Sequence, residues 1–385
     1  MLQINVSNFV QETPPFLIHP NKLKKILVCI SLFTTWAIFA DTPVKHMSHD
    51  HSNMEQHHEK VENHSMHHSV STIPLSIMEA GTHKAGHFMI SLRHMRMSMD
   101  DNSDKGNKLS DQEIISYPSL NSMTPFLSAV PKKMDMEMTM LEAMYGISDN
   151  HIFMLMANFV NKEMSLNSYS PMGNRDFLRV TNTSSSDLSN LSMSSFFKFK
   201  GSQNFRMNAE IGIDKSLGKN NIKKNVITPM NMTMNMTLPY AMQAGDKSTS
   251  LLTSFTIVSK GDLNFGGQLK RKSAVLKKDW NFGDSLTFNF WFSKLVTPKT
   301  SLFLNFKYQK LDKIEGRDLS INAPTQTANP QYYGGKSTSL STGLNIQLNH
   351  KNSLGFEYSV PLKQDLNGPQ MEVKNSFNFA YKLSF

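Results

Sequence analysis

The chain has 385 residues, and its 40 lysines and arginines outnumber 31 aspartates and glutamates, which gives a formal net charge of +9. This length suits one large β-barrel or two ordinary globular domains. The single cysteine, Cys29, excludes a disulfide framework, so the fold must depend on packing and on hydrogen-bonded sheet. The sequence shows no basic and aromatic module for nucleic acid, and we expect no nucleic-acid partner.

Residues 1–40 are predicted to be an N-terminal extension and a signal peptide. Three lysines between positions 22 and 25 precede Ile26–Phe39, an uncharged and mainly apolar run, and Ala40 is a small residue at the expected cleavage point. This order is typical of a cleavable secretory signal, and the run is short for a membrane span. A retained N-terminal anchor is the alternative.

Residues 41–85 are predicted to be a disordered periplasmic segment rich in histidine and methionine. The part at 46–68 has almost no apolar residues for a core. Imidazole binds copper, zinc and nickel, whereas thioether is soft and favours Cu(I). We therefore predict binding of Cu(I) or Cu(II) here, and a solvated linker with incidental histidines is the alternative. The predicted ligands are His46, His49, His51, His57, His58, His64, His67, His68, Met47, Met54 and Met66.

From residue 86 to 385, apolar and polar residues alternate in successive segments. Such alternation is typical of strands with one face in lipid and the other in water. We therefore predict an all-β fold, an antiparallel transmembrane β-barrel of about 12 strands. The strands are expected to start near His87, Met134, His151, Asp187, Asn204, Leu251, Leu263, Leu286, Leu302, Leu340, Leu354 and Val373.

The connections between these strands are expected to alternate in length, with tight turns such as Ser148–Asn150 between the long ones. Transmembrane barrels have short periplasmic turns and longer extracellular loops, so we expect both termini at the periplasmic rim. The longer connections are expected at about 98–133, 165–186, 215–248, 274–282, 312–336 and 364–371.

The last strand, Phe377–Phe385, places an apolar or aromatic residue at every second position and ends on Phe. It resembles the C-terminal signal of Gram-negative outer-membrane barrels, which implies recognition by the barrel assembly machinery. We therefore expect localisation in the Gram-negative outer membrane. The positive net charge also favours contact with lipopolysaccharide.

The strand face opposite the aromatic residues is predicted to line the lumen. On the first three strands this face is rich in methionine, and neighbouring strands should join these side chains into one patch. The patch is either flexible packing or a soft-metal path. Arg93, Arg206 and Glu210 are either a structural ion cluster or an electrostatic filter. The predicted lumen methionines are Met89, Met95, Met97, Met134, Met136, Met138, Met140, Met144, Met154 and Met156.

A second methionine run, Met230–Met236, alternates within the third long connection, where an exposed stretch needs no gap filling. Metal contact is therefore slightly favoured there over packing. The sequence shows no nucleophile-and-base motif, phosphate-binding loop or closed zinc site, and we predict that the protein is not an enzyme.

Four segments together resemble a family of predicted outer-membrane proteins labelled as transporters of the meta-pathway of phenol degradation. They are MISLRHMRM at 89–97, MDMEMTMLEAMYGISDNHIFMLMANF at 134–159, LPYAMQAG at 238–245 and LNGPQMEV at 366–373. The resemblance implies a barrel of the 12-strand type and a role in outer-membrane transport, and the family label implies aromatic solutes.

These features together predict an outer-membrane β-barrel transporter or channel for a small solute. The preferred solute is a soft metal, copper above others, bound by the histidine and methionine tail and by the lumen methionines. The first alternative is a passive channel for small aromatic or hydrophobic compounds. The second is a structural or metal-buffering surface barrel without transport.

Overall fold

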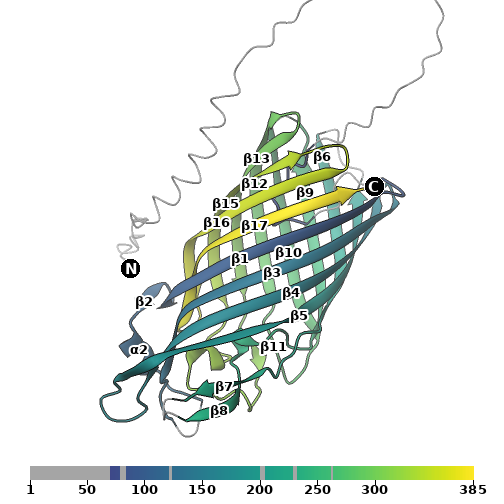
Figure 1. Cartoon of the computed structure of the whole chain (residues 1–385). Helices are drawn as coiled ribbons and strands as arrows, with labels where there is room; N and C mark the ends of the chain where they lie inside the picture. Colours follow the sequence, from purple (N-terminus) through teal and green to yellow (C-terminus); the bar gives the residue numbers. More distant parts are fainter. Residues whose placement is uncertain (1–69, 79–83, 121–123, 200–203, 229–231, 262) are drawn as a thin grey trace, which may run out of the picture.

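The computed structural model describes residues 70–78, 84–120, 124–199, 204–228, 232–261 and 263–385. They form a closed antiparallel barrel (Figure 1). The sheet closes because β17 pairs with β1, and twelve strands make up its wall, which confirms the predicted fold class. In chain order the strands are β1 (Phe88–Asp104), β3 (Ala129–Ser148), β4 (His151–Tyr169), β5 (Phe177–Phe199), β6 (Phe205–Ser216), β9 (Thr249–Ser259), β10 (Leu263–Leu276), β12 (Ser285–Thr297), β13 (Thr300–Leu311), β15 (Gly335–Gln347), β16 (Asn352–Leu366) and β17 (Gln370–Ser384).

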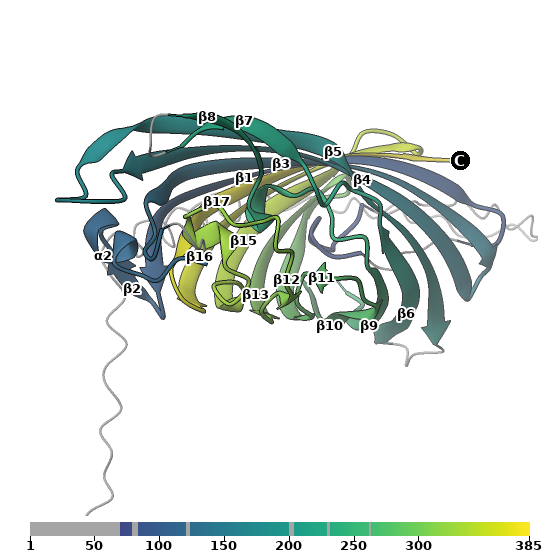
Figure 2. The same cartoon turned by 90° about the horizontal axis from the view of Figure 1, so that it is seen from below.

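The remaining elements belong to the longer connections, which gather at the end of the barrel opposite the C-terminus (Figure 1). We call this end the long-loop end and the other the short-turn end. Figure 2 shows the barrel from below, with the long connections in front. No helix in the described ranges is long and apolar enough to cross a membrane. The elements are β2 (Asn107–Leu109), α2 (Asp111–Ile115), β7 (Lys223–Ile227), β8 (Thr233–Thr237), η1 (Tyr240–Met242), β11 (Trp280–Asn281), β14 (Glu315–Gly316) and η2 (Gln326–Ala328).

The alternation in the sequence decides which face of each strand points outward. In β12, Phe288, Phe290 and Phe292 are exposed on the outer surface, whereas Asn289 and Trp291 between them are buried. Successive side chains of a strand point to opposite faces, so the aromatic row faces outward and the polar row inward. Closure of the sheet pairs the backbone of every wall strand on both sides, which a barrel in lipid requires.

Several strands extend farther toward the long-loop end than the alternation predicted. β5 begins at Phe177 instead of near Asp187, and its added residues pair with β4 from Tyr169↔Phe177 to Val160↔Asp187. The expected connection at 165–186 is therefore reduced to 170–176. Backbone pairing needs no apolar face, so the ladder continues where Thr, Asn and Ser occupy both sides of the strand.

Residues 70–78, which the sequence placed in the periplasmic segment, lie inside the barrel. Asn345 Nδ2 donates hydrogen bonds to the carbonyl oxygens of Ser71 (2.9 Å) and Ile73 (3.1 Å). Ile73 also packs in a buried cluster with Ile77 and Trp291. Residues 70–78 therefore form a short internal segment of the barrel, which the predicted domain boundary at residue 86 left out.

Candidate functional site

A stripe of methionines runs along the inner face of the three consecutive strands β1, β3 and β4. All ten methionines predicted for the lumen lie on this face. Six of them are buried, and the other four, Met95, Met97, Met136 and Met138, are half-buried. Their outward neighbours, such as Leu92 and Leu141, are exposed. The stripe therefore presents both packed and accessible thioethers to the lumen.

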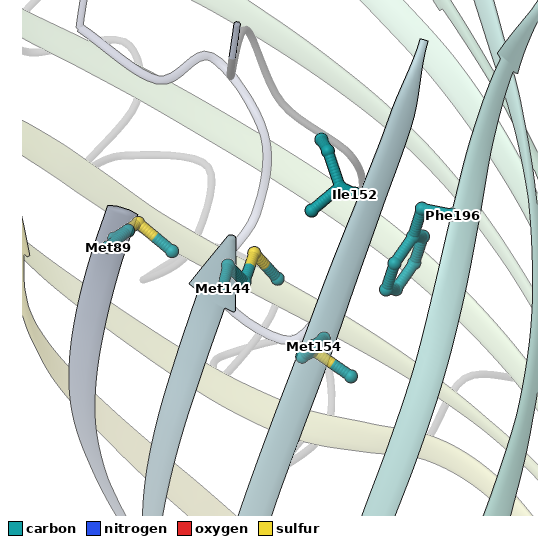
Figure 3. Packing of buried hydrophobic residues seen from close by; sticks show 5 residues of the cluster. All are labelled: Met89, Met144, Ile152, Met154 and Phe196. Atoms are coloured by element: carbon teal, nitrogen blue, oxygen red, sulfur yellow. The ribbon is translucent and has the colours of Figure 1, made fainter. Parts of the chain in front are cut away.

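The strand register brings these side chains next to one another. Met95 pairs with Met138 and Met97 with Met136 across β1 and β3. Side chains directly opposite in an antiparallel pair are close enough to touch. At the short-turn end, the stripe ends in a buried cluster to which β1, β3, β4 and β5 contribute, shown in Figure 3. The members of this cluster are Met89, Met144, Ile152, Met154 and Phe196.

Two further methionines extend the stripe toward the long-loop end. Met99 is the register partner of Met134, and Met134 in turn faces Met164 of β4. All three belong to or pack against one cluster that also holds Leu238 and Met242. Met99 and Met164 lie beyond the predicted lumen rows, which ended at Met97 and Met156, although both continue the same alternation.

A cavity of about 390 Å³ lies at the short-turn end of the lumen, between residues 70–78 and the barrel wall. Its apolar lining includes Met89 and Met144 of the stripe, together with Ile73 and Ile77 of the internal segment. Arg93, Glu142, Arg206, Lys260 and Lys382 supply its charged lining. This end of the stripe is therefore open to an internal space with both apolar and charged walls.

A second cavity of about 430 Å³ lies at the long-loop end, between the β7–β8 hairpin, the β4–β5 wall and the connection at 320–325. Met232, Met234 and Met236 of the predicted second run line it, and so does Met164 of the stripe. Met230 of the same run lies outside the described residues. The described part of the second run and the outer end of the stripe therefore face the same cavity.

The long connections fold inward over this end of the lumen. Tyr240 packs edge-on against Trp280 at 4.7 Å between ring centroids, within a buried cluster that also holds Ile314 and Ile321. Lys162 Nζ, on the inner face of β4, donates to the carbonyl oxygens of Ala241 (2.9 Å) and Gln243 (2.7 Å). Burial also raises the pKa of Tyr240, so its hydroxyl remains neutral.

The stretch of wall formed by β6, β9 and β10, which β5 separates from the methionine stripe, is polar and internally paired. Glu210 accepts hydrogen bonds from Ser194 Oγ and Ser254 Oγ, both at 2.9 Å, and lies 3.1 Å from Lys270 Nζ. One layer nearer the long-loop end, Asp214 pairs with Lys272. These carboxylates are therefore neutralised within the wall.

The three charged residues predicted as a cluster or filter take separate roles. Arg93 and Arg206 line the same short-turn cavity, and Arg93 faces Glu142 with 3.7 Å between Nη2 and Oε2. Glu210 pairs with Lys270 instead, and no ion pair joins it to Arg206 in the described part of the chain. The three residues therefore do not form one ion cluster. Arg93 and Arg206 line a cationic cavity, whereas Glu210 belongs to a wall whose carboxylates are neutralised.

The predicted histidine and methionine ligands of the tail, from His46 to His68, lie outside the described residues. Within the described ranges, no group of three or more His, Cys, Asp or Glu side chains is arranged to hold a metal ion. Metal binding by the tail stays a prediction.

No protein-family model matches the sequence, and no curated protein matches it. Among solved structures, an outer membrane channel from Pseudomonas putida F1 is similar over 80% of this chain and 100% of its own, at 14% identity and a TM-score of 0.52. The β domain of the Bordetella autotransporter BrkA matches over 78% and 100% at 7% identity and a TM-score of 0.41. The KdgM porin matches over 77% and 99% at 7% identity and a TM-score of 0.36.

The similarity to the Pseudomonas channel shows the fold, that of an outer-membrane β-barrel. The resemblance to the phenol meta-pathway family stays a prediction.

Proposed function

We propose that the protein is an outer-membrane channel that passes a small solute along the methionine stripe, with a soft metal, copper above others, as the preferred solute. The observation that carries this proposal is the continuity of the stripe. Met89 and Met144 line the short-turn cavity, Met164 lines the long-loop pocket, and half-buried methionines lie between them. Thioether sulfur binds Cu(I), and a row of flexible, similar ligands suits a passing ion better than one deep site.

In this proposal the short-turn end faces the periplasm and the long-loop end faces the cell exterior. The signal peptide within 1–40 directs export of the chain, and the barrel assembly machinery recognises Phe377–Phe385. Lipopolysaccharide surrounds the outer rim. Val70, the first described residue after the predicted tail, lines the short-turn cavity. In this proposal the histidines and methionines of the tail capture Cu(I) or Cu(II) for this end of the stripe.

The decisive variant replaces the four half-buried methionines, Met95, Met97, Met136 and Met138, with leucine. Leucine keeps the apolar volume and removes the sulfur, so packing is largely preserved while the soft ligand is lost. The matched control is Met193→Leu, because Met193 lies on the outer face of β5 and is 50% exposed. Copper accumulation is measured in cells with and without each variant. We expect the fourfold variant to accumulate no more than cells that lack the protein, and the control to match the parent.

Equal copper accumulation by the parent, the fourfold variant and cells without the protein would contradict the metal pathway. If uptake of small aromatic compounds depends on the protein in the same cells, the solute is apolar instead. If neither uptake depends on it, the barrel is a structural or metal-buffering surface protein.

The tail is tested by calorimetry of Cu(I) and Cu(II) binding to the mature protein and to a version that lacks residues 41–69. This deletion leaves the internal segment 70–78 in place. Histidine binds metal in its neutral form, so Cu(II) affinity should fall below about pH 6. Absence of measurable copper binding by the intact protein would rule out the tail as a metal site.

The second candidate function, a passive channel for small aromatic or hydrophobic compounds, is favoured by one specific observation. The long-loop pocket has a lining rich in apolar side chains, including Leu166, Val226 and Leu238 besides its methionines. An apolar pocket of this size suits a small hydrophobic molecule. The leucine variant separates the candidates, because leucine leaves an apolar path intact.

A further inference from the structure

The short-turn cavity has an unbalanced charge. Among the described residues, four cationic side chains line it, those of Arg93, Arg206, Lys260 and Lys382, against one carboxylate, that of Glu142. Lys382 takes part in an interaction of its own, and Lys260 is exposed in a turn. The two guanidinium groups are therefore the cations that determine what the interior of the cavity attracts.

Arg93 is buried without adequate partners. Only 5% of the residue is exposed, and its Nε atom has no hydrogen-bond acceptor. The ion pair with Glu142 spans 3.7 Å, which is longer than a hydrogen bond. A buried guanidinium normally has its N–H groups satisfied, because leaving such a donor unpaired is costly. The geometry of Arg93 thus calls for an acceptor from within the cavity.

Arg206 approaches the same space from β6, on another part of the wall. It is half-buried, and its side chain forms no hydrogen bond or ion pair with any described residue. The nearest inward carboxylate on its own strand, Glu210, is already neutralised by Lys270. Arg206 is therefore available for a ligand without breaking an existing contact.

The rest of the lining is apolar. Ile73 and Ile77 of the internal segment and Met89 and Met144 of the stripe face the same cavity. A bare inorganic anion would make no apolar contact with these side chains, whereas an organic acid would contact both the apolar and the cationic parts of the lining. The volume of about 390 Å³ lies in the range of small-molecule sites.

We propose that the short-turn cavity binds a small organic carboxylate, with its carboxylate held by Arg93 and Arg206 and its apolar body packed against Met89, Met144 and the internal segment. Guanidinium groups form strong, directional hydrogen bonds to carboxylates. The site shares Met89 and Met144 with the methionine stripe, but its affinity for a carboxylate depends on charge and not on sulfur, so this proposal and the proposed solute path can fail separately.

The test is calorimetric titration of the folded full-length protein with benzoate, benzamide and inorganic phosphate. Benzamide has the shape of benzoate without its charge, and phosphate has the charge without the apolar body. We expect saturable binding of benzoate and at least tenfold weaker binding of the other two, because each lacks one half of the interaction.

Arg206→Gln is the first variant, because it removes a cation that has no partner to leave behind. We expect it to weaken benzoate binding about tenfold. Arg93→Lys keeps the charge but loses the forked geometry and should weaken binding less. Arg96→Gln is the matched control, since Arg96 lies on the same strand as Arg93 with its side chain on the outer face, and it should bind as the parent does.

The proposal would be overturned by absence of benzoate binding by the intact protein, by equal binding of benzamide, or by an Arg206→Gln variant that binds benzoate as tightly as the parent. Phosphate binding equal to that of benzoate would also overturn it, because the apolar wall would then play no part. Folding of each variant is checked by its heat-dependent migration on a denaturing gel.

Discussion

Two parts of the lumen wall differ in how many side-chain groups they leave free to contact a solute. On β1, β3 and β4 the inner face carries the methionine stripe, whose thioethers need no hydrogen-bond partner. On β6, β9 and β10 the inner face is polar, and its carboxylates Glu210 and Asp214 are already paired with Lys270 and Lys272. A paired polar wall offers few free groups, so in the proposed channel a solute gains most of its contacts on the methionine side.

We expect the largest loss of stability when an ion pair in the polar wall is broken. Lys270→Met leaves Glu210, whose side chain is fully buried, without its counter-charge. We expect a loss of about 3 kcal/mol in the free energy of unfolding, at the lower end for a broken buried pair, because Lys270 is partly exposed. Urea unfolding of the refolded barrel measures this change. Lys294→Met, an exposed position on the neighbouring β12, serves as the control and should change stability by less than about 0.5 kcal/mol.

In the methionine wall, a change in side-chain shape should cost little stability, whereas a loss of side-chain volume should cost more. Met144 is 3% exposed in the short-turn cluster, and Met144→Ala should cost about 2 kcal/mol because a cavity forms. Met144→Leu should cost less than about 1.5 kcal/mol, since the volume is conserved. The same urea unfolding compares the two variants. A leucine variant as unstable as the alanine variant would show that this wall is as strictly specified as the polar one.

Lys162 connects the methionine wall to the long-loop end. Lys162→Met removes its hydrogen bonds to the carbonyl oxygens of Ala241 and Gln243 and should release this segment from the lumen. We expect a higher single-channel conductance in planar bilayers, with Lys133→Met on the outer face of β3 as the control. An unchanged conductance would mean that the Tyr240 and Trp280 packing holds the segment without help from Lys162.

The smallest expected effect concerns α2, which is attached to the outer end of the methionine wall. Asp111 accepts hydrogen bonds from Lys132 Nζ (2.8 Å) and Tyr169 Oη (2.5 Å). Burial alone would raise the pKa of Asp111, but hydrogen bonds from Lys132, Tyr169 and Asn167 outweigh it and lower that pKa.

A lowered pKa means that this attachment is fully present above the usual pKa of aspartate, about 3.9, and is lost as the pH falls through the folded value. Hydrogen exchange at residues 111–115, corrected for the intrinsic rate at each pH, should be constant from pH 7 to 5 and rise in stronger acid. In Asp111→Asn the exchange should already be fast at pH 7. A parent that loosens between pH 7 and 5 would assign the attachment to another group.

Much of the fold was readable from the sequence because side-chain alternation is a local property. The aromatic row of β12 and the methionine rows of β1, β3 and β4 needed only a period of two and the pairing of neighbouring strands. The same pattern predicted twelve strands, all of which are found in the wall. It failed at the outer parts of β5, where both faces are polar and only the backbone ladder defines the strand.

What the sequence determined by itself was therefore the barrel, its inner and outer faces and the methionine stripe, since each depends on residues close in the chain. Only the tertiary structure decided that residues 70–78 enter the lumen, that Glu210 pairs with Lys270, and that Arg93 and Arg206 share one cavity. These contacts join residues far apart in sequence. No local pattern encodes them, because they form only once the strands have paired and the barrel has closed.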